Sequence, residues 1–280
     1  MADPTWQRLH EDTLRGQIAS LRTAVAEILA GNYLPSFTDH SVTHSDQLCD
    51  LVDKLTEPLE AQLNEKEAFI LYASAYLHDS GLQHQRANET RVVGAILTER
   101  FPGRLWGELD TETQRSIVRE RHHRISGEMI TQSINAAYPT ILGIQLTDDW
   151  YPGQVRALAV AHNLYMDGQD RDEYAELTKD WGGVRMSLLS ALLRLADILD
   201  ESRRRSRLYL GNTRELSLES KMHWWRHYYV AEIEINTADR TIVLWFDFPP
   251  ARRAQYRDMI LPLQVPWIRA EFDRHAEVLA

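Results

Sequence analysis

The chain has 280 residues, 44% of them apolar, which is enough to bury the core of one large domain or of one domain with a substantial appendage. This composition excludes a disordered or fibrous chain. The formal charge of −10, from 31 basic and 41 acidic residues, disfavours non-specific binding of nucleic acid, which is itself a polyanion.

The beginning of the chain, Met1 to Trp6, lacks the cationic start and the apolar run of a signal peptide. No stretch approaches the roughly 18 apolar residues of a membrane span. The single cysteine, Cys49, forms no internal disulfide and builds no thiolate zinc site, so no oxidising compartment is needed. These features predict a cytoplasmic protein that does not contact a membrane.

Helical periodicity dominates from the N-terminus to about residue 205. Leu14, Ile18, Leu21, Val25 and Ile28 recur at steps of four and three, which predicts an amphipathic helix within residues 10–30. Two heptads are too few for a coiled coil, so packing on its own domain is favoured over dimerisation. Further helices are predicted at 45–55, 65–77, 88–100, from 111 through the 120s, 154–166 and 184–202.

The predicted helix 184–202 is apolar on nearly every side and is expected to be the central buried helix. After residue 205 the period changes to an alternation typical of strands, and 229–236 and 241–248 are predicted to form a hairpin. Residues 252–279 have a helical pattern that Pro262 and Pro266 are expected to interrupt.

The expected fold is therefore mainly α: a helical domain over residues 1–205, and a small C-terminal β-hairpin with helices over 206–280. Because a two-stranded hairpin is unstable alone, the C-terminal part is expected to pack on the helical domain.

Several polar side chains occupy helix positions that face the core. His162 follows Leu158 by four residues, and His122 follows Val118 by four, so both imidazoles are expected to point inward. His122 is expected to be the inward member of the His122-His123 pair. Asp197 shares a face with apolar residues of the most buried helix, where an ionised carboxylate is costly unless a cation or strong donors compensate it.

His44 and the pair His78-Asp79 complete the set of inward candidates. Alone, each has a simple structural explanation, such as a hydrogen-bonded core histidine or an aspartate that caps a turn. A divalent metal would explain why four histidines and two aspartates from separate helices all face the core, since imidazoles and carboxylates bind such an ion. Without cysteine ligands, an open catalytic or substrate-binding centre is favoured over a structural zinc site.

The ordered set of these motifs resembles the HD superfamily of metal-dependent phosphohydrolases, which are helical proteins named for an adjacent His-Asp pair. The motifs are His44, Leu77 to Leu82 with His78-Asp79, His122, His162, and Leu193 to Asp200 with Asp197. The Thr38 to Ser41 start, the stretch from Arg119 to Ser126 and the C-terminal strand pair are similar to the bacterial HD-CE type. In some members this type is joined to a chaperone-like ATPase, which the 280 residues do not contain.

The resemblance implies a role for each matching residue. His44, His78, Asp79 and Asp197 would bind the primary metal, and His122 and His162 would hold a second ion with Asp79 bridging. With one metal only, His122 and His162 would contact the phosphate or protonate the leaving oxygen. Asp79, His122 and Arg194 are the expected catalytic residues. Ligand types do not distinguish Mn, Fe, Ni, Co, Zn and Mg, or one ion from two.

Neighbouring residues are candidates for the substrate phosphate. They are His40, Arg121, Arg124 and Arg203. His40 could equally cap the following helix, and the basic run that starts at Arg203 could equally be a solvated face. The aromatic cluster from Trp224 to Tyr229 is expected to pack the hairpin on the helices, with stacking on a nucleobase as the alternative.

The expected function is that of a metal-dependent phosphohydrolase that cleaves a phosphoester of a nucleotide or nucleotide-like small molecule through a metal-bound water. A non-catalytic HD-type sensor of nucleotide or metal that acts on a protein partner is the main alternative, and a di-iron oxygenase is a further one. A homodimer and a chaperone-like ATPase are the candidate protein partners.

Overall fold

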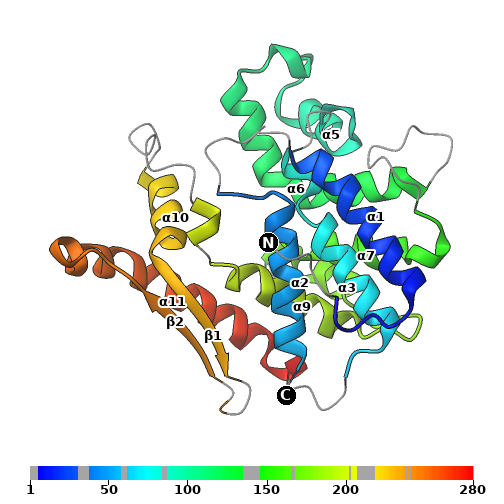
Figure 1. Ribbon diagram of the computed structural model, residues 1–280. Coiled ribbons are helices and arrows are strands. Elements are labelled where there is room, and N and C mark those ends of the chain that lie inside the picture. The colour runs from blue at the N-terminus through cyan, green and yellow to red at the C-terminus, as the bar shows by residue number, and fades with distance from the viewer. Residues whose placement is uncertain are drawn as a thin grey trace.

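The computed structural model describes residues 6–30, 38–57, 62–83, 87–134, 146–164, 168–201, 203–206, 218–236, 239 and 241–279. It confirms the mainly α fold with a small C-terminal hairpin (Figure 1). The α-helices are α1 (Asp12–Leu29), α2 (Val42–Thr56), α3 (Glu65–Leu77), α4 (Ser80–Gln83), α5 (Arg91–Arg100), α6 (Thr111–Ile134), α7 (Pro152–Ala161), α8 (Arg171–Leu177), α9 (Met186–Leu199), α10 (Leu218–Tyr229) and α11 (Arg253–Leu279). The strands are β1 (Val230–Asn236) and β2 (Thr241–Phe246).

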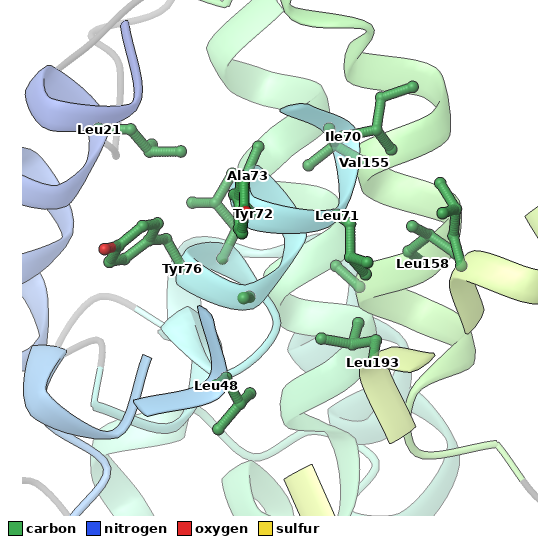
Figure 2. Close-up of a cluster of buried hydrophobic side chains, with 14 of the residues drawn as sticks. Leu21, Leu48, Ile70, Leu71, Tyr72, Ala73, Tyr76, Val155, Leu158 and Leu193 are labelled. Carbon is green, nitrogen blue, oxygen red and sulfur yellow. The ribbon is translucent and has the colours of Figure 1, made fainter. Parts of the chain in front are cut away.

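Helix α3 is the most enclosed element of the described core. Every residue from Glu67 to Leu77 is buried, because α1, α2, α7 and α9 surround this helix. Figure 2 shows its side chains among Leu21 of α1, Leu48 of α2, Leu158 of α7 and Leu193 of α9. Helix α9 is also largely buried, as expected, but the central position that the sequence assigns to 184–202 belongs to α3.

The enclosure of α3 explains how its last residues enter the interior. An asparagine caps the start of the helix: Asn64 accepts a hydrogen bond from the Glu67 amide, and the Glu67 carboxylate accepts one from the Asn64 amide. Glu67 is buried and also pairs with Arg185, which precedes α9. The start of α3 is thus fixed at residue 64, and its far end delivers His78 and Asp79 to the centre of the molecule.

The C-terminal part packs on the helical body through α11. Ile268 of α11 lies in one apolar cluster with Leu195 and Leu199 of α9. The hairpin is antiparallel, with Ile233 opposite Leu244, and a second cluster joins Tyr229 and Tyr256 at its base. In Figure 1, α10, the hairpin and α11 lie together at one side of the body. The expected domain boundary at residue 205 stays a prediction.

Several predicted elements differ from the observed ones. Helix α11 continues through Pro262 and Pro266, so the predicted interruption is wrong. Both prolines are exposed, and the carbonyls that lose their usual amide donors can bind water instead. Helices α8 and α10 were not expected. Helices α7 and α9 end at Ala161 and Leu199, so residues 162–164 and 200–201, which were predicted to be helical, are not, and the predicted ends at 166 and 202 lie outside the described residues.

Gly81 allows α4 to approach α6 closely. A Cβ atom at this position would lie 2.4 Å from the His122 carbonyl oxygen and 2.9 Å from the Ser126 amide nitrogen, both of which are backbone atoms. The Gly81 amide instead donates a hydrogen bond to Ser126 Oγ, 2.9 Å away. Only glycine permits this contact, which brings His78-Asp79 next to His122.

Gly81→Ala is expected to lower the free energy of unfolding by about 1–3 kcal/mol, because the backbone of α4 must move away from α6. Gly16→Ala is the matched control. Gly16 lies in α1 with open space around its Cα, so alanine there should raise stability by about 0.5–1 kcal/mol. Urea denaturation of both variants measures the difference, and equal stabilities would contradict the close packing of α4 on α6.

Within the described part of the chain, every helix is too short or too polar to span a bilayer.

Candidate metal centre

Three helices end at one point in the interior. His78 is the C-cap of α3, His162 is the C-cap of α7, and Asp200 is the C-cap of α9, while His44 lies in the first turn of α2. The C-terminal end of a helix carries a partial negative charge. Three such ends together favour a cation at the place where they meet.

Asp79 lies at the centre of this group, and its two carboxylate oxygens face different pairs of imidazoles. Oδ2 lies 3.2 Å from His78 Nε2 and 3.7 Å from His44 Nε2. Oδ1 lies 3.4 Å from His122 Nε2 and 3.6 Å from His162 Nε2. Each oxygen and its pair form a group of three residues that could hold a metal ion. The two groups share Asp79, as a bridging carboxylate between two ions would.

The other ring nitrogen of each imidazole is held by a hydrogen bond. The Nδ1 atoms of His78, His122 and His162 each lie 2.8–3.0 Å from the carbonyl oxygen three residues earlier in the chain. His44 Nδ1 lies 2.5 Å from Asp200 Oδ2. Because carbonyl and carboxylate oxygens only accept, Nδ1 is protonated in each ring, which leaves Nε2 as the atom that faces Asp79 and binds a metal when it carries no proton.

This arrangement fits a bound cation. Within the described ranges, the Nε2 atoms of His44 and His78 are buried without a hydrogen-bond partner, which is costly unless something positive meets them. His122 Nε2 and His162 Nε2 lie 3.2 Å apart, and with Nδ1 protonated they present lone pairs to each other. Atoms bound to one ion by bonds of about 2.1 Å lie roughly 3.0–3.5 Å apart. The distances around Asp79 are close to this range.

The groups of the cluster shift the pKa values of one another. Burial alone would raise the pKa of the Asp79 carboxyl, but the imidazoles of His78 and His162 hold it well below its usual range. Burial lowers the pKa of His122 to about 4, so this ring is neutral at pH 7 and can bind metal. Burial also opposes protonation of His78, yet Asp79 and Asp197 raise its pKa to about 9, so without an ion this ring carries a second proton, on Nε2, which a bound metal would displace.

Asp197 lies at the side of the histidine cluster that faces a cavity. Its Oδ1 lies 3.4 Å from His44 Nε2, and its side chain is 34% exposed, more than the fully buried position expected from the apolar helix. The exposure arises because Asp197 faces a cavity. Partial burial alone would raise the pKa of Asp197, but His44 and His78 hold it well below its usual range.

Asp200 orients His44 by accepting a hydrogen bond from its Nδ1–H group. Asp200 is 3% exposed, so its carboxylate faces the interior and not solvent. Carboxylates that hold a ligand histidine in this way fix its tautomer and raise its basicity.

Asp200→Asn is expected to weaken divalent metal binding by about 10–100-fold, because the amide can present its NH₂ group to His44 and release the fixed tautomer. Titration with Mn²⁺, followed by calorimetry, measures the affinity. Asp247→Asn, at an exposed carboxylate near the hairpin, is the control and should leave the affinity unchanged. Unchanged affinity in Asp200→Asn would contradict the orienting role.

A cavity of about 500 Å³ opens next to the cluster. One side belongs to the helical body and carries Asp79, His122, His162 and Asp197. The other side is formed by residues of α10 and α11: His223, Trp224, Arg226, His227, Trp267, Glu271 and Arg274. The C-terminal part therefore completes the wall of the cavity that contains the candidate metal ligands.

The structure places some of the other expected site residues at the cavity and others away from it. His40 lines the cavity, and its Nε2 lies 3.8 Å from Asp79 Oδ2 and 2.9 Å from the Arg205 guanidinium. Arg194 also lines the cavity, but its Nη1 group donates to the carbonyls of Ala161, His162 and Leu164, and its Nε and Nη2 donate to Glu271. These bonds hold α7 and α11 in place, and the expected catalytic role of Arg194 stays a prediction.

Three expected phosphate contacts lie elsewhere. Arg121, Arg124 and Arg203 are not among the described residues that line the cavity. Arg124 makes a two-pronged ion pair with Glu173, and Arg203 donates to the Tyr228 carbonyl and packs on its ring. Arg121 pairs with the neighbouring Glu120. These arginines were expected at the site because they are close to the candidate ligands in the sequence, but their positions in the fold direct them away from the cavity.

The sequence interpretation missed other residues at the site. His123 was expected to face outward, but it is buried, and its ring packs against His122 and His162. That face of α6 is interior because Gly127 packs against Val160 of α7. Arg119, one turn before His122, lines the cavity and could have been found from this spacing. The contributions of α10 and α11 depend on tertiary packing and left no local signal.

Comparison with known proteins agrees with this geometry. Neither the curated proteins nor the solved structures include a significant match to this sequence. The HD-CE family model matches residues 34–272, which include all the candidate metal ligands and most of the C-terminal part. This match covers well over half of the chain and confirms the resemblance of the sequence to the HD superfamily. The chain belongs to the HD-CE family of HD-type domains.

Proposed function

We propose that the protein is a metal-dependent phosphohydrolase that cleaves a phosphoester of a nucleotide or nucleotide-like small molecule. The observation that carries this proposal is the position of Asp79, whose two oxygens face His44 with His78 and His122 with His162. The cluster borders a cavity of about 500 Å³, which is within the size range of small-molecule sites.

The residues of the cavity suit a phosphorylated ligand. A divalent cation bound to the cluster would polarise a phosphoryl oxygen and lower the pKa of a nearby water. Five arginines line the cavity: Arg119, Arg194, Arg205, Arg226 and Arg274. Arg194 and Arg274 pair with Glu271, and Arg226 pairs with Glu201, so Arg119 and Arg205 are the best candidates to contact a phosphate. Half-buried His40 and buried Arg205 lie on the Asp79 side of the cavity, where they are placed to orient a substrate oxygen.

The proposal is tested by measuring phosphate release from a panel of nucleotides after chelation and after readdition of Mn²⁺, Fe²⁺, Ni²⁺, Co²⁺, Zn²⁺ or Mg²⁺. We expect release only with a divalent metal, and metal content measured by plasma mass spectrometry should follow activity. Oxygen consumption by the iron-loaded protein is measured in parallel. Metal binding without release of phosphate from any substrate would overturn the proposal.

A non-catalytic sensor is the second candidate, and one observation favours it. The cavity is shared by the helical body and by α10 and α11, so a ligand would contact both parts of the chain. Occupancy could then be transmitted to a protein partner through α11. Tight nucleotide binding without turnover would support the sensor, whereas turnover that depends on metal would support the hydrolase.

A further inference from the structure

A second cavity, of about 340 Å³, lies between α10 and α11. Its walls are mostly apolar and include Met222, Ile260 and Leu263. His223, Arg226 and Trp267 line both this cavity and the one beside the metal cluster. The two cavities are therefore neighbours that share a wall.

One polar side chain in the second cavity has no partner among the residues that the structure describes. Gln264 is 1% exposed, and neither its Nε2 nor its Oε1 makes a hydrogen bond with any of them. An amide that is buried among apolar groups loses its hydration without compensation. A ligand that offers one donor next to one acceptor would satisfy both atoms.

Helix α11 changes character along the face that lines the two cavities. The first lining residues, Ile260 and Leu263, are apolar. Gln264 lies one turn after Ile260, and Trp267 lies one turn after Leu263. The last two lining residues, Glu271 and Arg274, are charged. At about 1.5 Å per residue, Gln264 and Glu271 lie about 10 Å apart along the axis. This order suits a ligand with a flat heteroaromatic end and a charged end.

Trp267 adds a surface for a flat ring. It is 42% exposed, and the guanidinium of Arg226 lies 4.3 Å from the centre of its ring. Arg226 is anchored through its Nε to Glu201, 2.8 Å away, which fixes the pair at the junction of the two cavities. Tryptophan and arginine planes are the side chains on which nucleobases stack.

Resting on the proposed hydrolysis of a nucleotide, we propose that the cavity between α10 and α11 binds the nucleobase, with Gln264 pairing with its edge and Trp267 packing on its face. The phosphate end would then lie in the larger cavity beside Asp79. Adenine is the best match, because a carboxamide pairs with its N6 amino group and N7 in a two-pronged geometry.

The test is calorimetric binding of the four ribonucleoside 5′-monophosphates and of ribose 5-phosphate, which has the same phosphate but no base. The wild-type protein should bind adenosine 5′-monophosphate about tenfold more tightly than ribose 5-phosphate. Gln264→Leu should remove most of this difference and leave ribose 5-phosphate binding unchanged. Gln255→Leu, at an exposed position of the same helix, is the matched control and should behave as wild type.

The thermal stability of the unliganded protein distinguishes a binding role from a structural one. Leucine replaces an unpaired buried amide, so the Tm of Gln264→Leu should equal or exceed that of the wild type. A lower Tm, or equal binding of adenosine 5′-monophosphate and ribose 5-phosphate, would overturn the nucleobase site. Phosphate release is measured separately. Binding that depends on the base, without release of phosphate, would support this site and refute the proposed hydrolysis. Release of phosphate without binding that depends on the base would refute this site alone.

Discussion

Asp79→Asn is expected to lower phosphate release by about a thousandfold and to remove most of the bound divalent cation. Asparagine keeps the size of the side chain but removes the charge that both pairs of imidazoles face. The cation contributes several kcal/mol to the reaction, and each 1.4 kcal/mol corresponds to a factor of ten in rate. Steady-state kinetics and metal analysis of the same preparation measure both effects.

Asp258→Asn is the matched control for this experiment. Asp258 is an exposed carboxylate of α11 that pairs with the adjacent Arg257, so its variant should keep full activity and metal content. Circular dichroism before each assay excludes loss of fold. Full metal content in Asp79→Asn would refute the central position assigned to this residue.

Arg194→Met is expected to lower the free energy of unfolding by about 3 kcal/mol, the lower end of the usual cost of breaking a buried ion pair, because Glu271 keeps Arg274 and His275 as partners. Arg194 and Glu271 are 9% and 5% exposed, and their guanidinium and carboxylate are in direct contact. The substitution also leaves the carbonyls of Ala161, His162 and Leu164 without their donor. Because one of these carbonyls belongs to His162, metal affinity should fall as well.

Arg124→Met provides a sharp comparison, since Arg124 makes an equally well-formed two-pronged pair with Glu173 at the surface. Its side chain is 28% exposed and that of Glu173 is 40% exposed, so its loss should cost less than about 1 kcal/mol. Chemical denaturation of both variants gives the two costs. Equal costs would show that burial does not set the strength of the Arg194 pair.

The helical part of the fold could be predicted because its signals are local. The predicted range 65–77 coincides with α3, since an asparagine cap and a continuous apolar run mark its limits. The spacing of Leu14, Ile18 and Leu21 defines the inner face of α1. The hairpin was predicted for the same reason, because alternation along each strand is a property of neighbouring residues.

The metal cluster was accessible from the sequence because a polar residue on an apolar helix face is an anomaly that requires an explanation. His162 and His122 were found in this way, and the structure brings both to Asp79. The same method missed His123, because one helix position can be interior through a neighbour that the sequence does not reveal. Gly127 and Val160 make that face of α6 interior.

The side of the cavity that α10 and α11 form could not be predicted from the sequence, for a different reason. Trp224 and Tyr229 were treated as a packing cluster, and α10 was not foreseen, since aromatic residues have weak helix propensity. The alignment of Arg226 over Trp267 depends on how α10 meets α11. Only the folded chain shows that this surface faces the candidate ligands rather than solvent.

The candidate ligands extend from residue 44 to residue 197 and belong to five separate stretches of chain. No short peptide from this protein can reproduce the centre, because each stretch supplies too few donors to retain an ion. A bound ion would therefore act as a reversible cross-link that exists only in the native state. Resistance to heat and the capacity to hold metal become two measures of one equilibrium, and the concentration of free metal would set both.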